Sequence, residues 1–348
     1  MIKVPKEVTK IMKTLGDAGF ENYVTGECVI DSMMGEKTYS WDVITKAGFE
    51  ELTELFPEAK ILSTKYSVLR KELIDEICNE KGEVIGEEGY IIDISTYRTK
   101  NASESSGDDE NLFTDNVEED LARRDFTIDA IAMNPYAGVK PIVDPYEGRE
   151  DVRKKIIKTV GEASESFRKE PIRMMKAIRY AAPFGFDLHK SVYEAIVANY
   201  SLLETVKPEK IRDEFTDIMA APHAGKGLNM LMNTGILRVI LGEQQFSRLT
   251  RREKSDLMAL CEGIEKTKQV PERRLGLFYS TIHKKRSMPS IDKLNFDEET
   301  HQHLVDAVHD MLNLSENVEV FSLFALGYPA EKREQQNRFD ESRIHFVE

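Results

Sequence analysis

Apolar side chains at the start of the chain recur every three or four residues. Val8, Ile11, Met12 and Leu15 share this spacing, and glycines follow at positions 16 and 19. The pattern is typical of an amphipathic helix that buries one face and ends at a glycine. We therefore expect the chain to open with a helix packed on the segments that follow.

Strand patterns come next. Residues 40–45 and 90–98 alternate between two faces, residues 23–24 form a short strand before Gly26, and residues 49–56 have a helical pattern that Pro57 ends. A glycine between a strand and a helix can leave backbone amides free to hold a phosphate, although it is usually only a turn. These patterns predict a sheet with flanking helices.

A helical pattern follows later in the chain. Pro171 opens a segment in which Met175, Ile178 and Ala182 share one face. With the strands before and the helices after, the predicted fold class is α+β.

Composition sets the outer limits. A chain of 348 residues with 41% hydrophobic content can bury the cores of two or more domains. No apolar run approaches the roughly 20 residues of a membrane span, and residues 1–13 are charged and amphipathic, unlike a signal peptide. Cys28, Cys78 and Cys261 have neither disulfide nor zinc spacing. We therefore expect a cytoplasmic protein with reduced cysteines and no membrane partner.

The distribution of charge is more informative than the net value of −14. Residues 101–120 carry eight acidic side chains and no lysine or arginine, which predicts a solvated loop. Residues 149–179 carry ten bases against five acids, and Arg173 and Lys176 lie three apart on one predicted helix. That face could meet RNA or a nucleotide, or it could be an ordinary solvated cationic face.

A phosphate-binding pattern lies between these two segments. Arg123 and Arg124 precede Asp125, Phe126 and Thr127, which places two guanidinium groups beside a carboxylate, an aromatic ring and a hydroxyl. Guanidinium groups bind phosphate through paired hydrogen bonds. For an isolated arginine pair, the alternative is a helix end with two solvated side chains.

The whole string from 118 to 136, EEDLARRDFTIDAIAMNPY, resembles the RRDFT-x-N-A motif of the class II tRNA nucleotidyltransferases (CCA-adding enzymes) and the bacterial poly(A) polymerases. Asp129 stands where that family has asparagine. Residues 169–186, KEPIRMMKAIRYAAPFGF, resemble the family's helix in which an acid and an arginine read the incoming base. Glu170 and Arg173 occupy those two positions.

The resemblance implies a nucleotidyltransferase head at 1–140, a helical neck at 141–200 and a helical body at 201–311. It also implies the addition of CMP or AMP, from CTP or ATP, to the 3′ end of tRNA or another RNA. Asp42 and Asp93 match the second and third acids of the catalytic magnesium cage. The residues implied in nucleotide binding are Gly26, Arg123, Arg124, Asp125, Asp129, Glu170, Arg173 and Arg179, and those implied in RNA binding are Lys176, Lys284, Lys285 and Arg286.

Three positions depart from the family pattern. Ser40 stands at the first acid, Glu27 at the second glycine of the turn and Ile30 at an arginine. Each change weakens the binding of a metal ion or of phosphate, because it removes a ligand or a cation or adds a negative charge. We expect weakened Mg²⁺ binding and impaired activity. The alternative is a non-catalytic RNA-binding relative in which Asp42 and Asp93 are leftover strand carboxylates.

The tail has a different character. Residues 313–348 resemble the C-terminal end of FMN-dependent nitroreductases, whereas nothing earlier in the chain matches that family. We therefore treat residues 312–348 as a separate tail and expect no FMN site.

Overall fold

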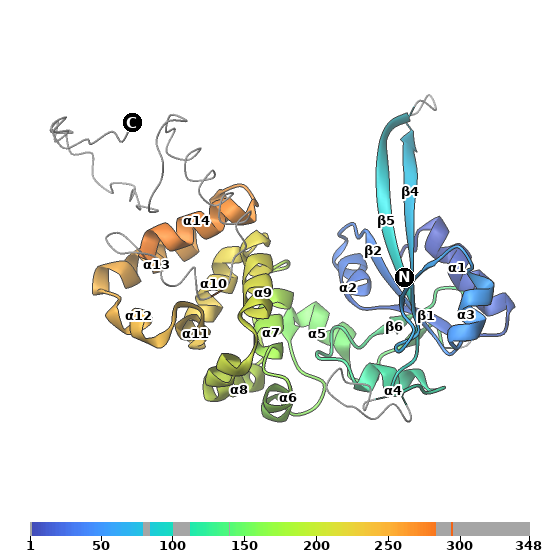
Figure 1. Cartoon of the computed structure of the whole chain (residues 1–348), viewed down its shortest axis with the longest axis horizontal. Coiled ribbons are helices and arrows are strands. Elements are labelled where there is room, and N and C mark those ends of the chain that lie inside the picture. The colour runs from blue at the N-terminus through green and yellow to red at the C-terminus, as the bar shows by residue number, and fades with distance from the viewer. Residues whose placement is uncertain (1, 79–83, 100–111, 139, 283–293, 295–348) are drawn as a thin grey trace.

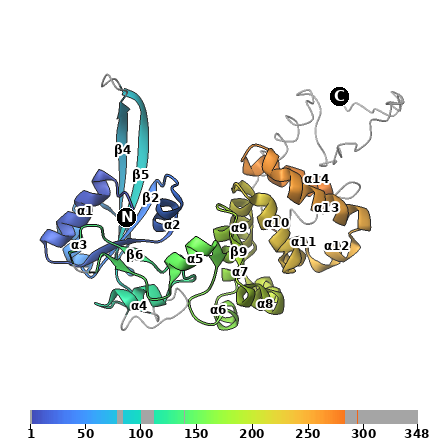
Figure 2. The ribbon, with the colours of Figure 1, turned by 180° about the vertical axis from the view of Figure 1, so that it is seen from behind.

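The computed structural model describes residues 2–78, 84–99, 112–138, 140–282 and 294. A part built on a β-sheet comes first along the chain, and a helical part follows it (Figures 1 and 2). The predicted α+β fold class is confirmed. Of the helices in the described ranges, none is long and apolar enough to cross a membrane.

The main sheet has seven strands in the order β3-β4-β5-β2-β1-β6-β7. All neighbouring strands are antiparallel except β2 and β5, which run parallel with Asp42 beside Asp93. The strands are β1 (Asn22–Thr25), β2 (Ser40–Thr45), β3 (Lys60–Ser63), β4 (Val68–Cys78), β5 (Val84–Thr96), β6 (Ala132–Met133) and β7 (Ile142–Val143). The predicted strand at 90–98 is thus the second half of a longer strand, and β4 and β5 form a hairpin that projects from the sheet (Figure 1).

Four helices belong to the sheet-containing part: α1 (Lys6–Asp17), α2 (Glu27–Met34), α3 (Phe49–Leu55) and α4 (Val117–Ala122). The four apolar residues that predicted the first helix are all buried on α1, so that prediction is confirmed. The prediction of a solvated loop through Asp120 is wrong at its end. Val117 and Asp120 are buried on α4, and the Asn116 side chain caps this helix by accepting from the Glu118 amide.

The helical part begins with α5 (Gly148–Lys154) and a two-stranded parallel sheet of β8 (Ile156–Ile157) and β9 (Asp187–Leu188). Arg173–Ala181 form α7, as the sequence predicts, with its apolar side chains buried. The other helices are α6 (Ala163–Lys169), α8 (Lys190–Asn199), η1 (Tyr200–Thr205), α9 (Pro208–Ala220), α10 (Ala224–Asn233), α11 (Ile236–Leu241), α12 (Glu243–Arg248), α13 (Arg251–Gly263), η2 (Ile264–Lys266) and α14 (Pro271–Ile282).

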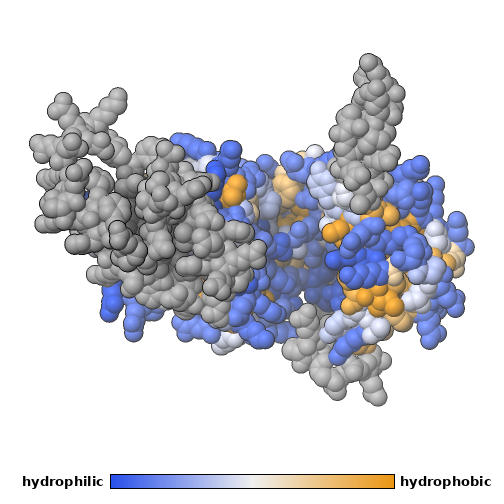
Figure 3. Space-filling model, turned by 45° about the horizontal axis from the view of Figure 1, so that its top comes forward, coloured by the Kyte–Doolittle hydropathy of each residue, from blue (hydrophilic) through white to orange (hydrophobic). Residues whose placement is uncertain are grey.

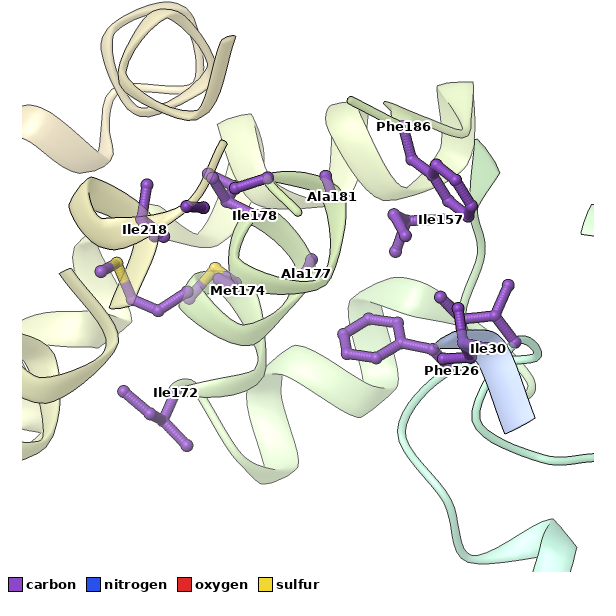
Figure 4. Close-up of a cluster of buried hydrophobic side chains, with 14 of the residues drawn as sticks. Ile30, Phe126, Ile157, Ile172, Met174, Ala177, Ile178, Ala181, Phe186 and Ile218 are labelled. Atoms are coloured by element: carbon purple, nitrogen blue, oxygen red, sulfur yellow. The ribbon is translucent and has the colours of Figure 1, made fainter. Parts of the chain in front are cut away.

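One hydrophobic cluster runs from the sheet-containing part into the helical part. Figure 4 shows Ile30 beside Phe126, with Ile157 and Phe186 above them and the apolar face of α7 alongside. Phe126 also makes an edge-to-face contact with Tyr180 of α7, with the ring centroids 5.4 Å apart. Ile30 is only 2% exposed, and full burial of such a side chain stabilises a fold by about 1.5–3 kcal/mol. Ile30 therefore belongs to the core at this junction.

The face of the molecule in Figure 3 is largely hydrophilic between the two parts, and apolar residues gather on the sheet-containing part. The exposed apolar side chains of that part include Ile61, Leu62 and Ile91. Charged side chains line the junction between the two parts, and the candidate site lies there.

Candidate active site

Gly26 forms the turn between β1 and α2, as the sequence predicts. Its φ of 84° lies in the left-handed region, and a Cβ atom at this position would lie 2.7 Å from Oδ2 of Asp42. No side chain caps the start of α2. A residue without a Cβ is therefore required both by the backbone conformation and by the close approach of Asp42.

Asp42 and Asp93 are brought together by strand register. They are partners in the parallel pair β2–β5, so both side chains point to the same face of the sheet. Burial raises the pKa of Asp42 to about 6; Arg124 opposes this shift, and the carboxylates of Asp129 and Asp93 add to it. The environment of Asp42 therefore disfavours its charged form.

Asp93 is held by an arginine that the sequence reading missed. Arg70 lies opposite Asp93 in the antiparallel pair β4–β5. Its Nε donates to Oδ1 at 2.7 Å and its Nη2 donates to Oδ2 at 2.8 Å, so both carboxylate oxygens accept from one guanidinium group. Only the strand register could have revealed this pair, because the two residues lie on separate strands of a hairpin.

Ser40 begins β2 and is exposed at the strand end, beside Ile91 in register. It provides a hydroxyl where the resemblance implies a carboxylate. Within the described ranges, no three histidine, cysteine or acidic side chains are grouped so that they could hold a metal ion. The residues present do not fit the three-carboxylate magnesium cage.

Arg123 and Arg124 are paired with carboxylates, and their side chains are only 20% and 11% exposed. Both bind Asp120, which is fully buried on α4: Arg123 Nε lies 3.0 Å from Oδ1, and Arg124 Nη2 lies 3.4 Å from Oδ2. Arg124 Nη1 lies 3.5 Å from Oδ1 of Asp129. Burial lowers the pKa of Arg124, but the nearby carboxylates of Asp129, Asp120 and Asp42 outweigh it and raise the pKa. Arg124 thus stays charged beside Asp42.

A second group of charges joins the sheet-containing part to α7. Arg173 Nε lies 2.6 Å from Oδ1 of Asp125, and its Nη2 lies 3.0 Å from Oε2 of Glu170. Lys176 Nζ lies 3.1 Å from Oδ2 of Asp125. Arg173 and Lys176 share one face of α7, as the sequence predicts, and both contact Asp125 there while their side chains stay 17% and 29% exposed.

Glu27 and Arg179 form a third link across the junction. Arg179 Nη1 donates to Oε1 of Glu27 at 2.7 Å, and its Nε donates to Oε2 of Glu214 on α9 at 2.9 Å. The guanidinium group also lies 4.5 Å from the centroid of the Tyr180 ring. The sequence predicts that Arg179 binds nucleotide, and in this structure Arg179 is paired with Glu27.

These contacts give the site its chemical character. Every cationic side chain described above has a carboxylate partner, and a phosphate group that enters must compete with carboxylates for them. Sequence reasoning found most of these residues but missed Arg70, Asp120 and Glu214. The predicted RNA contacts Lys284, Lys285 and Arg286, and the tail at 312–348, lie outside the described residues.

Two family models match the chain. Residues 22–158 match the poly(A) polymerase head domain, and residues 185–246 match a region described as "Probable RNA and SrmB- binding site of polymerase A". The first match contains the Gly26 turn, both strand carboxylates and the motif at Arg123. The first match begins after α1, and residues 159–184, which include α6 and α7, lie between the two matches.

The sequence is also similar to those of known CCA-adding enzymes. The chain is similar to the CCA-adding enzyme of Geobacillus thermodenitrificans (strain NG80-2), with 32% identity over 243 residues, which are 70% of this chain and 56% of that protein. It is also similar to the CCA-adding enzyme of Geobacillus stearothermophilus, with 32% identity over 232 residues, which are 66% of this chain and 53% of that protein. The chain therefore spans about half the length of these relatives.

Solved structures share the fold. The crystal structure of the Bacillus stearothermophilus CCA-adding enzyme in complex with CTP superposes with a TM-score of 0.70 and 26% identity, covering 91% of this chain and 74% of that one. The Thermotoga maritima CCA-adding enzyme complexed with tRNA superposes with a TM-score of 0.61 and 18% identity, covering 89% and 73% of the two chains. The second likeness concerns the fold alone.

Proposed function

The chain belongs to the family of tRNA nucleotidyltransferases that carry a poly(A) polymerase head domain, and from this premise we propose that it adds CMP or AMP slowly to an RNA 3′ end. CTP and ATP are the proposed nucleotide substrates, and tRNA is the proposed acceptor. The proposal includes the division into a head at 1–140, a neck at 141–200 and a body at 201–311.

The observation that carries the proposal is the meeting of motif residues at the junction. Asp125 of the head motif contacts Arg173 of α7, and Arg173 contacts Glu170. An arginine offers only donors and a carboxylate only acceptors, so the pair Glu170–Arg173 can match a base edge that has both. We propose that this pair reads cytosine or adenine.

Other residues of the junction would hold the phosphates. We propose that Arg123, Arg124 and Arg179 bind them through charge-assisted hydrogen bonds, next to the amides of the Gly26 turn. Asp129 would keep Arg124 oriented, since the two side chains are 3.5 Å apart. Lys176, with Lys284, Lys285 and Arg286, would contact the RNA backbone.

Slow addition is expected from the groups on the catalytic face, by which we mean the face of the sheet that carries Ser40, Asp42 and Asp93. Asp42 lies beside Arg124, both oxygens of Asp93 accept from Arg70, and Ser40 offers only a hydroxyl. A polar face arranged in this way can orient an RNA hydroxyl and a nucleotide but offers little stabilisation of the charge that develops during transfer.

The pairing of Asp93 with Arg70 favours a second candidate function. A non-catalytic relative would bind the RNA 3′ end and a nucleotide through the junction and would carry out no transfer. The bidentate Arg70–Asp93 pair supports this candidate, because a guanidinium group that binds both oxygens of the carboxylate competes with any metal ion or substrate group there.

Incorporation of labelled CTP and ATP into tRNA that lacks its 3′ end separates the two candidates. We would compare the unmodified protein with Asp42→Ala and with the double variant Ser40→Asp, Glu27→Gly, and measure tRNA binding in parallel. Slow incorporation that disappears in Asp42→Ala supports the transferase. Intact tRNA binding without incorporation, with activity only in the double variant, supports the non-catalytic relative. Absence of both binding and incorporation in every variant would contradict both.

A further inference from the structure

We infer that Arg70 takes the place of a divalent metal ion at Asp93, on the face of the sheet that carries Asp42 and Asp93, and thereby weakens metal binding there. The inference concerns the proposed nucleotidyltransferase site. Its test measures metal binding without nucleotide or RNA. The inference can therefore fail while the proposed function holds, and the proposed function can fail while the inference holds.

The geometry of the pair is the first argument. The two donors of Arg70 are spaced to meet the two oxygens of Asp93, at 2.7 and 2.8 Å. A metal ion would need at least one of these oxygens as a ligand. A divalent ion at Asp93 would therefore compete with the guanidinium group for these oxygens and would lie close to its positive charge.

The surroundings of Arg70 are the second argument. Strand register places Glu72 and Asp42 on the same face of the sheet as Arg70 and Asp93. Carboxylates on this face favour a positive charge, and Arg70 supplies one from the chain itself.

The other ligand positions are the third argument. The resemblance places Ser40 at the first acid of the cage, so Asp42 and Asp93 are the carboxylates that remain. Asp93 is paired with Arg70, whereas the ion pairs of Arg124 are with Asp120 and Asp129. Restoring a carboxylate at Ser40 alone would leave Asp93 occupied.

Manganese binding, followed by the loss of the free Mn²⁺ signal in electron paramagnetic resonance, tests the inference. We would compare the unmodified protein, Ser40→Asp, Arg70→Gln and the double variant Ser40→Asp, Arg70→Gln. The double variant is expected to bind Mn²⁺ at least about tenfold more tightly than Ser40→Asp, because only the double variant has three available carboxylates. Equal affinity of Ser40→Asp and the double variant would overturn the inference.

Lys71→Gln is the matched control. Lys71 is the next residue on β4, its side chain points to the opposite face, and it pairs with Glu58. The substitution removes the same charge one residue away, so Mn²⁺ affinity should stay unchanged when it is combined with Ser40→Asp. A gain equal to that of the Arg70 variant would mean that net charge alone is responsible, and the inference would fail.

Arg70→Lys keeps the inference testable if Arg70→Gln does not fold. Lysine retains the charge but cannot donate to both carboxylate oxygens in the fixed geometry of a guanidinium group. In the Ser40→Asp background, Arg70→Lys should bind Mn²⁺ more tightly than the arginine form. An affinity no higher than that of Ser40→Asp alone would count against the role of the bidentate pair.

Discussion

Replacement of Glu27 by glutamine should strengthen the binding of nucleoside triphosphates. Glu27 links the start of α2 to Arg179 of α7 at 2.7 Å, where an incoming phosphate would meet the same guanidinium group. The Glu27→Gln substitution keeps the length of the side chain and removes its charge. Arg179 should stay in position, because Glu214 and the Tyr180 ring still hold it.

The size of the effect follows from the exposure of the pair. The Glu27 side chain is 55% exposed, so solvent screens the interaction, and an exposed ion pair contributes about 0–1 kcal/mol. Loss of this competitor should therefore lower the dissociation constant for CTP by up to about fivefold. Glu214 remains beside Arg179, which limits any larger gain.

Isothermal titration of CTP would measure the change, at about 50 mM and about 300 mM salt, because screening weakens exposed pairs. The advantage of Glu27→Gln over the unmodified protein should shrink at the higher salt concentration. Glu50→Gln is the control, since Glu50 is an exposed acid in the first turn of α3 and lies away from the junction. If Glu27→Gln binds CTP no better than Glu50→Gln, then Glu27 does not compete for the phosphate site.

Three further predictions concern stability, measured by chemical denaturation. Gly26→Ala should lower the free energy of unfolding by about 1–3 kcal/mol. The loss should exceed that of Gly35→Ala, because both glycines have a positive φ but only at Gly26 would the added Cβ meet a carboxylate oxygen. Equal losses in the two variants would refute the importance of this contact. Burial raises the pKa of Asp42 to about 6 in the folded protein, so ionisation of this carboxylate destabilises the fold as the pH rises from about 4 through that pKa. Asparagine does not ionise, so the stability of Asp42→Asn relative to the unmodified protein should increase by about 2 kcal/mol over this range. A difference in stability that does not vary with pH would contradict the raised pKa of Asp42. Asp120→Ala should cost about 3 kcal/mol, because it removes the fully buried carboxylate that Arg123 and Arg124 share, and their side chains are only 20% and 11% exposed. Glu119→Ala on the exposed side of the same helix should be nearly neutral; similar losses in both would show that the ion pairs are not responsible.

The sequence by itself determined the local elements and the family. The helix over Val8–Leu15, the strand at Ser40–Thr45 and the turn at Gly26 follow from periodicity and from the conformational freedom of glycine, which are properties of neighbouring residues. The motif at Arg123 could be identified because it is contiguous. Such signals can be read along the chain without knowledge of what packs against it.

Only the tertiary structure decided which charges meet. Arg70 and Asp93 lie 23 residues apart and Glu27 and Arg179 lie 152 residues apart, so their contacts depend on strand register and on the docking of α7 against the sheet-containing part. The burial of Asp120, and the place of Ile30 in the core, depend on the same docking. The periodicity of a segment does not reveal which distant residue its side chains will contact, because strand register and packing are set by the whole core. The sequence could therefore name the charged residues of the site, whereas the fold alone determined that they neutralise one another.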